Sequence, residues 1–272
     1  MYNNYVQVYK GKYYSKTKLK TVSRVIAFDL DETLGSFADL DILWNALKKL
    51  EIGVDFNEFL DLYPEFLRYG ILPIMEYLYQ KKLTGQCSKI YIYTNNQCHS
   101  SWSQMIASYF DYKIKTQEPL FDKIINAFKV NNRQIELSRT SHEKTHFDFI
   151  KCTLLPKTTE ICFIDNSEFD MMKTDRIYYI QPISYYHNLT VHDIADRFFC
   201  SPIGQPFTQN KGKIMNRLEQ FKMNRRVNDK IDVFVAHKIM YHIKEFFYLT
   251  NKRNRTKKIK IHWGRSTRKR RN

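Results

Sequence analysis

Short apolar runs recur along the chain, each followed by polar residues, and they predict buried strands. Four such runs span residues 25–28 (VIAF), 89–93 (KIYIY), 160–164 (EICFI) and 176–180 (RIYYI). Mainly apolar runs of four or five residues, without a polar residue at every second position, are typical of strands buried on both faces of a parallel sheet. We therefore expect these segments to belong to one sheet.

Between these runs, apolar residues recur at the three- and four-residue spacing of helices. The spacing predicts helices over residues 37–50, 56–80, 101–109, 142–152 and 214–248. Prolines and a glycine interrupt the second of these segments. Residues 121–137 have mixed character, and their structure is left open. Strands that alternate with helices favour an α/β fold with a parallel sheet flanked by helices.

The composition is that of a globular protein with one main core. The chain has 272 residues, of which 43% are hydrophobic and 15% aromatic. It has no run of about 18 apolar residues and no apolar segment near its N-terminus, which argues against a membrane span and a secretory signal. Its five cysteines form no C-x-x-C pair and are typical of reduced thiols. We expect an intracellular protein, cytoplasmic or nuclear, that is neither secreted nor bound to a membrane.

The net charge of +16 is concentrated at the two ends of the chain. Six basic residues and no acidic ones precede Phe28, and eleven basic residues and no acidic ones lie between Asn251 and Asn272. Subtracting these seventeen from the 44 basic residues leaves 27, against 28 acidic residues in between. Blocks of like charge contact nucleic acid, acidic proteins or import receptors, or serve solubility alone.

These features divide the chain into four parts. They are a basic N-terminal arm (1–24), an α/β domain (25–200), a helical C-terminal extension (201–250) and a basic, disordered tail (251–272). The tail is a candidate for non-specific binding of nucleic acid, because that affinity comes from lysine and arginine contacts to phosphates. The oligomeric state is left open.

Candidate chemistry lies directly after the first apolar run. Asp29 and Asp31 follow that run and are themselves followed by Thr33 and Gly35. Open α/β sheets bind their ligands at the carboxyl ends of such strands. Two carboxylates close together there are costly unless a cation or a reaction needs them. The pattern therefore indicates a catalytic or metal-binding loop.

The sequence FDLDETL over residues 28–34 resembles motif I of the haloacid dehalogenase (HAD) superfamily, whose signature is D-x-D-x-T. Within that superfamily, it is similar in particular to the phosphatases that act on the C-terminal domain of RNA polymerase II. These are known as NLI-interacting-factor-like phosphatases. The resemblance implies a Rossmann-like sheet and a Mg²⁺-dependent phosphatase that forms an aspartyl-phosphate. It makes Asp29 the nucleophile and Asp31 the general acid and base. Thr33 would fix the loop beside the substrate.

Two further segments match the next motifs of the family. Thr94 ends the run 89–93, and its hydroxyl and the backbone N–H of Asn95 would hold phosphoryl oxygens, with Asn96 nearby. The third motif is a lysine that neutralises the phosphoryl group and the carboxylates. Lys144 is the preferred candidate because the predicted helix after it fits the family layout, and Lys151 is the alternative.

The fourth motif is an acidic residue after a later strand. Asp165 follows the run 160–164, and the resemblance makes it a Mg²⁺ ligand together with Asp29 and Asp31. Asn166 would bind the metal directly or through water. The four motifs lie within residues 25–182 and occur in the family's order.

A competing motif overlaps the third. Residues 142–146 spell H-E-x-x-H, the signature of a zinc-protease helix, with Glu143 as the base. No third ligand is evident from the sequence. Two measurements would separate the hypotheses: bound zinc would favour the protease, and Mg²⁺-dependent phosphatase activity would favour the phosphatase.

The spacing of the motifs bears on the substrate. Gaps of 65 residues from Asp29 to Thr94 and 50 residues from Thr94 to Lys144 leave room for short insertions but not for a large cap domain. An open site suits a phosphate carried on a macromolecule, and we expect a phosphoprotein phosphatase acting on serine or threonine. Two alternatives are a phosphatase for nucleotides or nucleic-acid ends and a catalytically silent HAD-fold protein. The silent protein would hold nucleic acid or a protein assembly through its basic termini.

Overall fold

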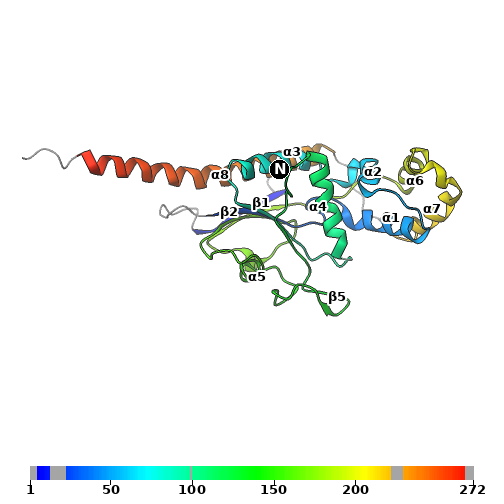
Figure 1. The fold of residues 1–272 in the computed structure, drawn as a ribbon, viewed down its shortest axis with the longest axis horizontal. Coiled ribbons are helices and arrows are strands. Elements are labelled where there is room, and N and C mark those ends of the chain that lie inside the picture. The colour runs from blue at the N-terminus through cyan, green and yellow to red at the C-terminus, as the bar shows by residue number, and fades with distance from the viewer. Residues whose placement is uncertain (1–4, 13–22, 99, 222–228, 267–272) are drawn as a thin grey trace, which may run out of the picture.

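The computed structural model describes residues 5–12, 23–98, 100–221 and 229–266, with the helical backbone alone over residues 251–266. It is an α/β structure around a six-stranded sheet in the order β1-β8-β7-β2-β3-β4 (Figure 1). The strands are β1 (Val6–Lys10), β2 (Arg24–Phe28), β3 (Lys89–Tyr93), β4 (Lys123–Ile125), β7 (Glu160–Ile164) and β8 (Ile177–Pro182). All neighbours pair in parallel except β1, which is antiparallel to β8. The prediction of a mostly parallel sheet flanked by helices is thus confirmed.

The four predicted strands are β2, β3, β7 and β8, and the structure adds two at the sheet edges. Strand β1 lies in the segment predicted as an arm, and Arg24, also placed there, begins β2. Strand β4 lies in the segment left open, as does a hairpin of β5 (Lys129–Val130) and β6 (Arg133–Gln134). The hairpin turn has φ of 49° at Asn131 and 61° at Asn132, as tight hairpins require.

The order of the strands sets the place of a ligand site. From β2 the chain proceeds through β3 to β4 on one side and then returns to β7 and β8 on the other side of β2. The strand order therefore reverses between β2 and β7. In open α/β sheets, ligands bind at the carboxyl ends of the strands at such a reversal.

The helices cover the two faces of the sheet unequally. They are α1 (Phe37–Lys49), α2 (Phe56–Asp61), α3 (Ile71–Leu83), α4 (Ser100–Ile114), α5 (His146–Thr153), α6 (Val191–Cys200), α7 (Lys211–Glu219) and α8 (Asp229–Ser266), with 3-10 helices η2 (Pro64–Phe66), η3 (Asp170–Met172) and η4 (Gln205–Asn210). Ile26 and Phe28 of β2 face a large core shared with every α-helix except α5. Val25 and Ala27 face a smaller core with α5 and η3. Figure 1 shows α3, α4 and α8 on one side of the sheet and α5 on the other.

The predicted C-terminal extension completes the large core. Leu218 of α7 and Ile239, Ile243 and Phe247 of α8 are buried in it, at the spacing of an amphipathic helix. Helix α8 continues to Ser266, so residues 251–266 are helical where we predicted disorder. Lysine and arginine favour helix, and no proline interrupts this stretch. The last six residues of the predicted tail lie outside the described residues.

Hydrogen bonds and ion pairs fix α8 against the edge of the sheet. Glu245 accepts from Lys10 Nζ at 2.7 Å and from the Tyr178 hydroxyl at 2.5 Å. His242 Nδ1 lies 3.2 Å from the same carboxylate. One helix therefore ties together β1 and β8. Within the described part of the chain, no helix has both the length and the apolar character needed to cross a lipid bilayer.

Candidate active site

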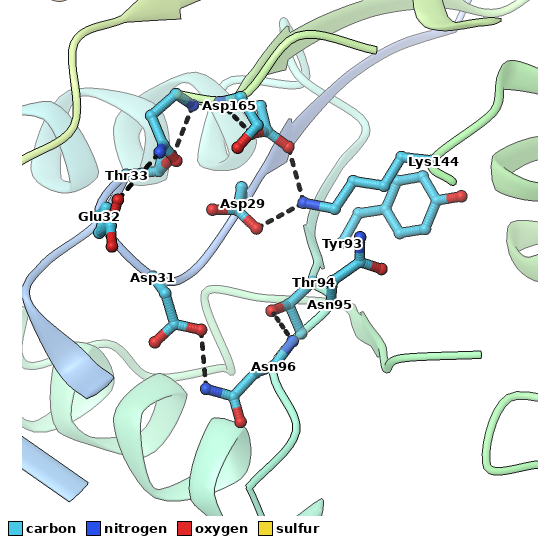
Figure 2. Close-up of polar contacts among 12 residues, drawn as sticks. Asp29, Asp31, Glu32, Thr33, Tyr93, Thr94, Asn95, Asn96, Lys144 and Asp165 are labelled. Carbon is cyan, nitrogen blue, oxygen red and sulfur yellow. Dashed lines mark hydrogen bonds and ion pairs between the residues drawn. The ribbon is translucent and has the colours of Figure 1, made fainter. Parts of the chain in front are cut away.

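Three predicted site residues stand at the carboxyl ends of three adjacent strands. The N–H of Asp29, after β2, donates to the carbonyl at the end of β7, at 2.9 Å. The N–H groups of Thr94, after β3, and Asp165, after β7, donate likewise to the last residues of β4 and to β8, at 3.0 and 3.2 Å. The sheet ladder therefore extends to these residues, and their side chains gather at one edge (Figure 2).

These side chains surround a cavity of about 230 Å³. Its lining residues are Asp29, Asp31, Glu32, Thr94, Asn95, Asn96, Lys144, Asp165, Asn166, Ser167 and Phe169. Eight of the nine site residues predicted from the sequence are among them, and the exception is Thr33.

Lys144 lies between two of the carboxylates. Its Nζ donates to Asp29 Oδ1 at 2.5 Å and to Asp165 Oδ2 at 2.7 Å (Figure 2). The side chain is buried, with Nζ 5.7 Å from the ring centroid of Tyr93 and 5.2 Å from that of Phe169. Burial alone would lower the pKa of Lys144, but the two carboxylates outweigh it and raise that pKa. The lysine is therefore held as a cation.

The carboxylates of Asp29 and Asp165 are held in different ways. Asp29 Oδ2 has no hydrogen-bond partner among the described residues, so one oxygen of this buried side chain is free. Asp165 Oδ1 accepts from the N–H of Ser167 at 2.9 Å. Burial raises the pKa of Asp165, with Asp29 adding to the effect and Lys144 opposing it. Of these two carboxylates, Asp29 is the one with a free oxygen.

Asp31 is oriented by an asparagine. Its Oδ2 accepts from Asn96 Nδ2 at 2.7 Å, and its buried Oδ1 has no hydrogen-bond partner among the described residues. Burial, and next the charge of Asp29, raises the pKa of Asp31 to about 7. A carboxyl group that titrates near neutral pH can both give and take a proton.

The turn after β3 carries the predicted phosphoryl-binding groups. Thr94 Oγ1 accepts from the N–H of Asn96 at 2.9 Å, which leaves its own proton free to donate. Asn96 Oδ1 accepts from the N–H of Cys98 at 2.7 Å. Both polar atoms of the Asn96 amide make a hydrogen bond, so this residue orients Asp31.

Thr33 and Asn166 join two loops. Thr33 Oγ1 donates to Asn166 Oδ1 at 2.8 Å and accepts from the N–H of Asn166 at 3.0 Å. The Nδ2 group of Asn166 donates to Ser184 Oγ at 2.9 Å and to Glu32 Oε2 at 3.3 Å. Thr33 therefore fixes the loop after β2 to the loop after β7, and it does not face the cavity.

Two buried arginines at the site were missed in the sequence, because neither belongs to a motif or a periodic pattern. Arg68 donates through Nε to the Thr33 carbonyl and through Nη2 to the Glu32 carbonyl, both at 2.5 Å. Glu32 has φ of 59°, a conformation that residues other than glycine rarely adopt. Arg68 thus holds the strained turn of the D-x-D-x-T loop. Arg139 contacts the loops on the other side of the site.

The remaining sequence candidates lie elsewhere. Lys151 is exposed on α5, so Lys144 is the lysine of the site. Helix α5 begins at His146 and not at His142 as predicted, because Thr145 caps it by accepting from the N–H of Asp148. The ring of His142 packs on Phe128, and His146 Nδ1 lies 3.2 Å from Thr174 Oγ1. The structure therefore does not assemble the histidine pair that the zinc signature requires.

The donor set bears on the predicted Mg²⁺. Among the described residues, no three histidine, cysteine or acidic side chains are close enough to hold one metal ion. Asp31 and Asn166 are turned to other partners, whereas Asp29 and Asp165 contact one ammonium group. Magnesium is commonly held by one or two carboxylates, with waters and phosphate oxygens completing its shell. The mutual repulsion of Asp29, Asp31 and Asp165, which contributes to the raised pKa values of Asp31 and Asp165, also favours a cation at the site. The residues present therefore fit Mg²⁺ through Asp29 and Asp165.

Comparison with known proteins identifies no relative. The sequence matches no protein-family model, and no curated protein and no solved structure matches it. The chemistry of the site therefore has to be argued from its own side chains.

Proposed function

We propose that the protein is a Mg²⁺-dependent phosphatase of the HAD type, which hydrolyses phosphomonoesters through a phosphorylated aspartate. The observation that carries this proposal is the contact of Lys144 Nζ with both Asp29 and Asp165, in a cavity that also takes in Asp31 and Thr94. A cluster that served stability alone would not leave Asp31 Oδ1 buried and unpartnered, because such an atom costs about 1–3 kcal/mol. The arrangement favours chemistry over a structural ion pair.

In the first step, Asp29 Oδ2 attacks phosphorus while the bond from phosphorus to the leaving oxygen breaks. Asp31 gives its proton to that oxygen. Water then attacks the phosphorylated Asp29, Asp31 takes the proton from the water, and inorganic phosphate leaves as the bond to Asp29 breaks. Lys144 and the Thr94 hydroxyl donate to phosphoryl oxygens throughout. Bound Mg²⁺ would supply further neutralisation of the phosphoryl charge, held by Asp29 and Asp165.

The surroundings of the cavity support a substrate that carries its phosphate on a macromolecule. Between Asp29 and Thr94 the chain forms α1 to α3, which pack into the large core. Between Thr94 and Lys144 it forms α4, β4 and the β5–β6 hairpin. None of these described elements forms a separate domain over the site, and a cavity of about 230 Å³ holds little more than a phosphoryl group and its immediate ester. We propose phosphoserine or phosphothreonine in a protein as the substrate class.

Hydrolysis of p-nitrophenyl phosphate tests the reaction. Wild type in Mg²⁺ should release nitrophenol, and Asp29→Asn should lower the rate by roughly 10³-fold or more, because the substituted amide is not a nucleophile. Asp196→Asn is the matched control, since Asp196 lies on the exposed face of α6, away from the cavity, and its variant should keep the wild-type rate. Removal of divalent cations with EDTA should abolish turnover.

Equal rates for wild type and Asp29→Asn, with both proteins folded by circular dichroism, would contradict the proposal. A screen of phosphopeptides, nucleotides and 5′- or 3′-phosphorylated oligonucleotides then assigns the substrate class. Preference for oligonucleotide ends would replace the phosphoprotein assignment and leave the reaction unchanged.

A second candidate function is binding through the C-terminal end of the chain. Helix α8 extends well beyond the rest of the protein in Figure 1, and its last turns carry part of the basic block between Asn251 and Asn272. A cationic extension of this kind supports contact with a polyanion such as nucleic acid. It is compatible with catalysis, because it lies outside the residues that form the cavity.

A further inference from the structure

Arg139 joins three segments of the chain beside the cavity. Its side chain is buried, and its Nη1 donates to the carbonyls of Thr94 and Asn126, each at 3.0 Å. Its Nη2 donates to Asn95 Oδ1 at 2.7 Å and to the carbonyl of His142 at 3.0 Å. One guanidinium group thus bonds the turn after β3, the end of β4 and the loop that leads to Lys144.

The contact with Asn95 decides how that side chain is turned. Arginine has only donors, so it can be bonded only by the oxygen of the Asn95 amide. The other polar group of the Asn95 amide, Nδ2, is therefore the one not bonded to Arg139. It has no hydrogen-bond partner among the described residues. Asn95 lines the cavity together with Thr94 and Lys144, as Figure 2 shows. Because the Asn95 oxygen is hydrogen-bonded to Arg139, the two N–H donors of Asn95 Nδ2 remain available to an anion in the cavity.

The same arginine also fixes the place of Lys144. Its Nη2 reaches the carbonyl of Glu143 at 3.5 Å, next to the firmer bond with His142. Its guanidinium lies 4.9 Å from the ring centroid of Tyr93, whose hydroxyl accepts from the N–H of Thr145 at 3.2 Å. The backbone on both sides of Lys144 is therefore held by the pair of Arg139 and Tyr93.

The electrostatics of Arg139 favour an anion nearby. Its hydrogen bonds among the described residues all end on uncharged oxygens, and its buried Nε has no partner there. A buried cation without a carboxylate partner is costly. A phosphoryl group bound at Asn95 would bring negative charge close to this cation and offset part of that cost.

We propose that Asn95 binds a phosphoryl oxygen of the substrate through its side-chain Nδ2, and that Arg139 is the positioning residue that turns the amide for this contact. The inference rests on the proposed phosphatase function, and it adds a donor to the backbone N–H of Asn95 expected from the sequence. It also couples that donor to Lys144 through one guanidinium group.

The decisive variant is Asn95→Asp. Aspartate keeps the shape of the side chain and still accepts from Arg139, but it replaces the N–H donors by a negatively charged oxygen. We expect phosphate affinity, measured by titration calorimetry with inorganic phosphate, to fall by about 10- to 100-fold, because a hydrogen bond to a charged group is lost and the added charge repels phosphate. The unfolding temperature should stay the same or rise, because the bond to Arg139 becomes an ion pair. Asn216→Asp, at an exposed position of α7, is the matched control and should bind phosphate like wild type.

Arg139→Lys tests the positioning role. Lysine keeps the charge but cannot bond Thr94, Asn95 and His142 at once. It should raise KM for p-nitrophenyl phosphate by about tenfold in the wild-type background and by much less in an Asn95→Ala background, because the two side chains act on one contact.

Unchanged phosphate affinity in Asn95→Asp would overturn the inference and leave the phosphatase proposal standing, if wild type hydrolyses ester. Full additivity of the Arg139→Lys and Asn95→Ala effects would also overturn the positioning role. A wild type that binds phosphate but hydrolyses nothing overturns the reaction alone, since the affinity of Asn95→Asp still tests the contact. Should Arg139→Lys fail to fold, the calorimetry on Asn95→Asp remains the test.

Discussion

Asp31 is a residue of the site whose charge lowers the stability of the folded protein. Its carboxyl group is buried with one oxygen unpartnered, and its pKa is raised to about 7 from an ordinary value of 3.8. A raised folded-state pKa means that ionisation disfavours folding as soon as the pH exceeds the unfolded value. The penalty grows from about pH 4 and reaches its full size above pH 7.

Replacing Asp31 by asparagine should therefore stabilise the protein and stop turnover. The variant keeps an oxygen for Asn96 Nδ2 and removes the buried charge. We expect a gain of roughly 4 kcal/mol in the free energy of unfolding at pH 8 and little gain at pH 4. Urea unfolding at both pH values, with EDTA present, measures it. A gain of equal size at both pH values would show that the charge is not the cause.

At the scale of elements, α8 is the clearest case of packing supported by polar contacts. Burial by itself would raise the pKa of Glu245, but hydrogen bonds outweigh it, first from Lys10 and then from Tyr178 and His242. The net effect is a pKa below the ordinary value of 4.5. Stability from such a group is present above the unfolded pKa and is lost as the pH falls through the lower, folded-state value.

Glu245→Gln should accordingly weaken the attachment of α8 to β1 and β8 at neutral pH. The pairs are partly exposed, so we expect a loss of about 1 kcal/mol or less, or about 2–3 °C in unfolding temperature, at pH 7. The difference from wild type should shrink as the pH falls below 4.5 and vanish once the pH lies below the lowered folded-state pKa, where the wild-type carboxylate is protonated as well. Scanning calorimetry across this range measures it, with Glu219→Gln at the exposed end of α7 as control. A difference that does not shrink as the pH falls from 7 to the acid end of the folded range would speak against the charge of Glu245.

The elements that could be predicted from sequence are the ones whose burial is complete. Strands β2 and β7 lie in the middle of the sheet, so nearly every side chain is apolar and the pattern is unambiguous. Strands β1 and β4 are edge strands with partly exposed side chains, and their pairing depends on partners far away in the sequence. The long α8 was foreseen as helix up to Tyr248 but not beyond, because charge density was taken as a sign of disorder.

Some residues of the site could likewise be predicted from the sequence, and others could not. Asp29, Thr94 and Asp165 follow strands, so their meeting place follows once the strands are known to be parallel neighbours. Lys144 could be chosen over Lys151 only through a motif. Arg139 could not be foreseen, because its role arises from a contact with Thr94, 45 residues earlier in the chain.

At the scale of the whole molecule, the basic segments and the candidate active site occupy different parts of the sequence. The residues between the basic ends nearly balance in charge, and the cavity lies among them. The α8 side chains that the structure describes run to Thr250, which is buried, and the basic block follows from Asn251 in the sequence. Binding of polyanions and turnover of phosphate esters should therefore be separable.

Deleting residues 251–272 should weaken binding of duplex DNA or RNA by roughly tenfold or more at low salt and flatten its salt dependence. Hydrolysis of p-nitrophenyl phosphate should stay unchanged. A full-length chain with the eleven lysines and arginines of this segment replaced by glutamine controls for length. Fluorescence anisotropy over a series of salt concentrations measures the slope. Undiminished affinity in both variants would assign the binding to another surface.

The unequal covering of the sheet has a consequence for inactivation. In the described part of the chain, seven α-helices contribute to the large core on one side of the sheet, whereas α5 and η3 are the helices of the smaller core on the other side. Lys144 is carried by the segment that leads into α5. A local opening of this thin layer would withdraw the ammonium group while the thick layer stayed intact, and the acidic groups left behind would repel one another until the ammonium group returned. Mild stress should thus suppress the proposed activity reversibly, well before the molecule as a whole denatures.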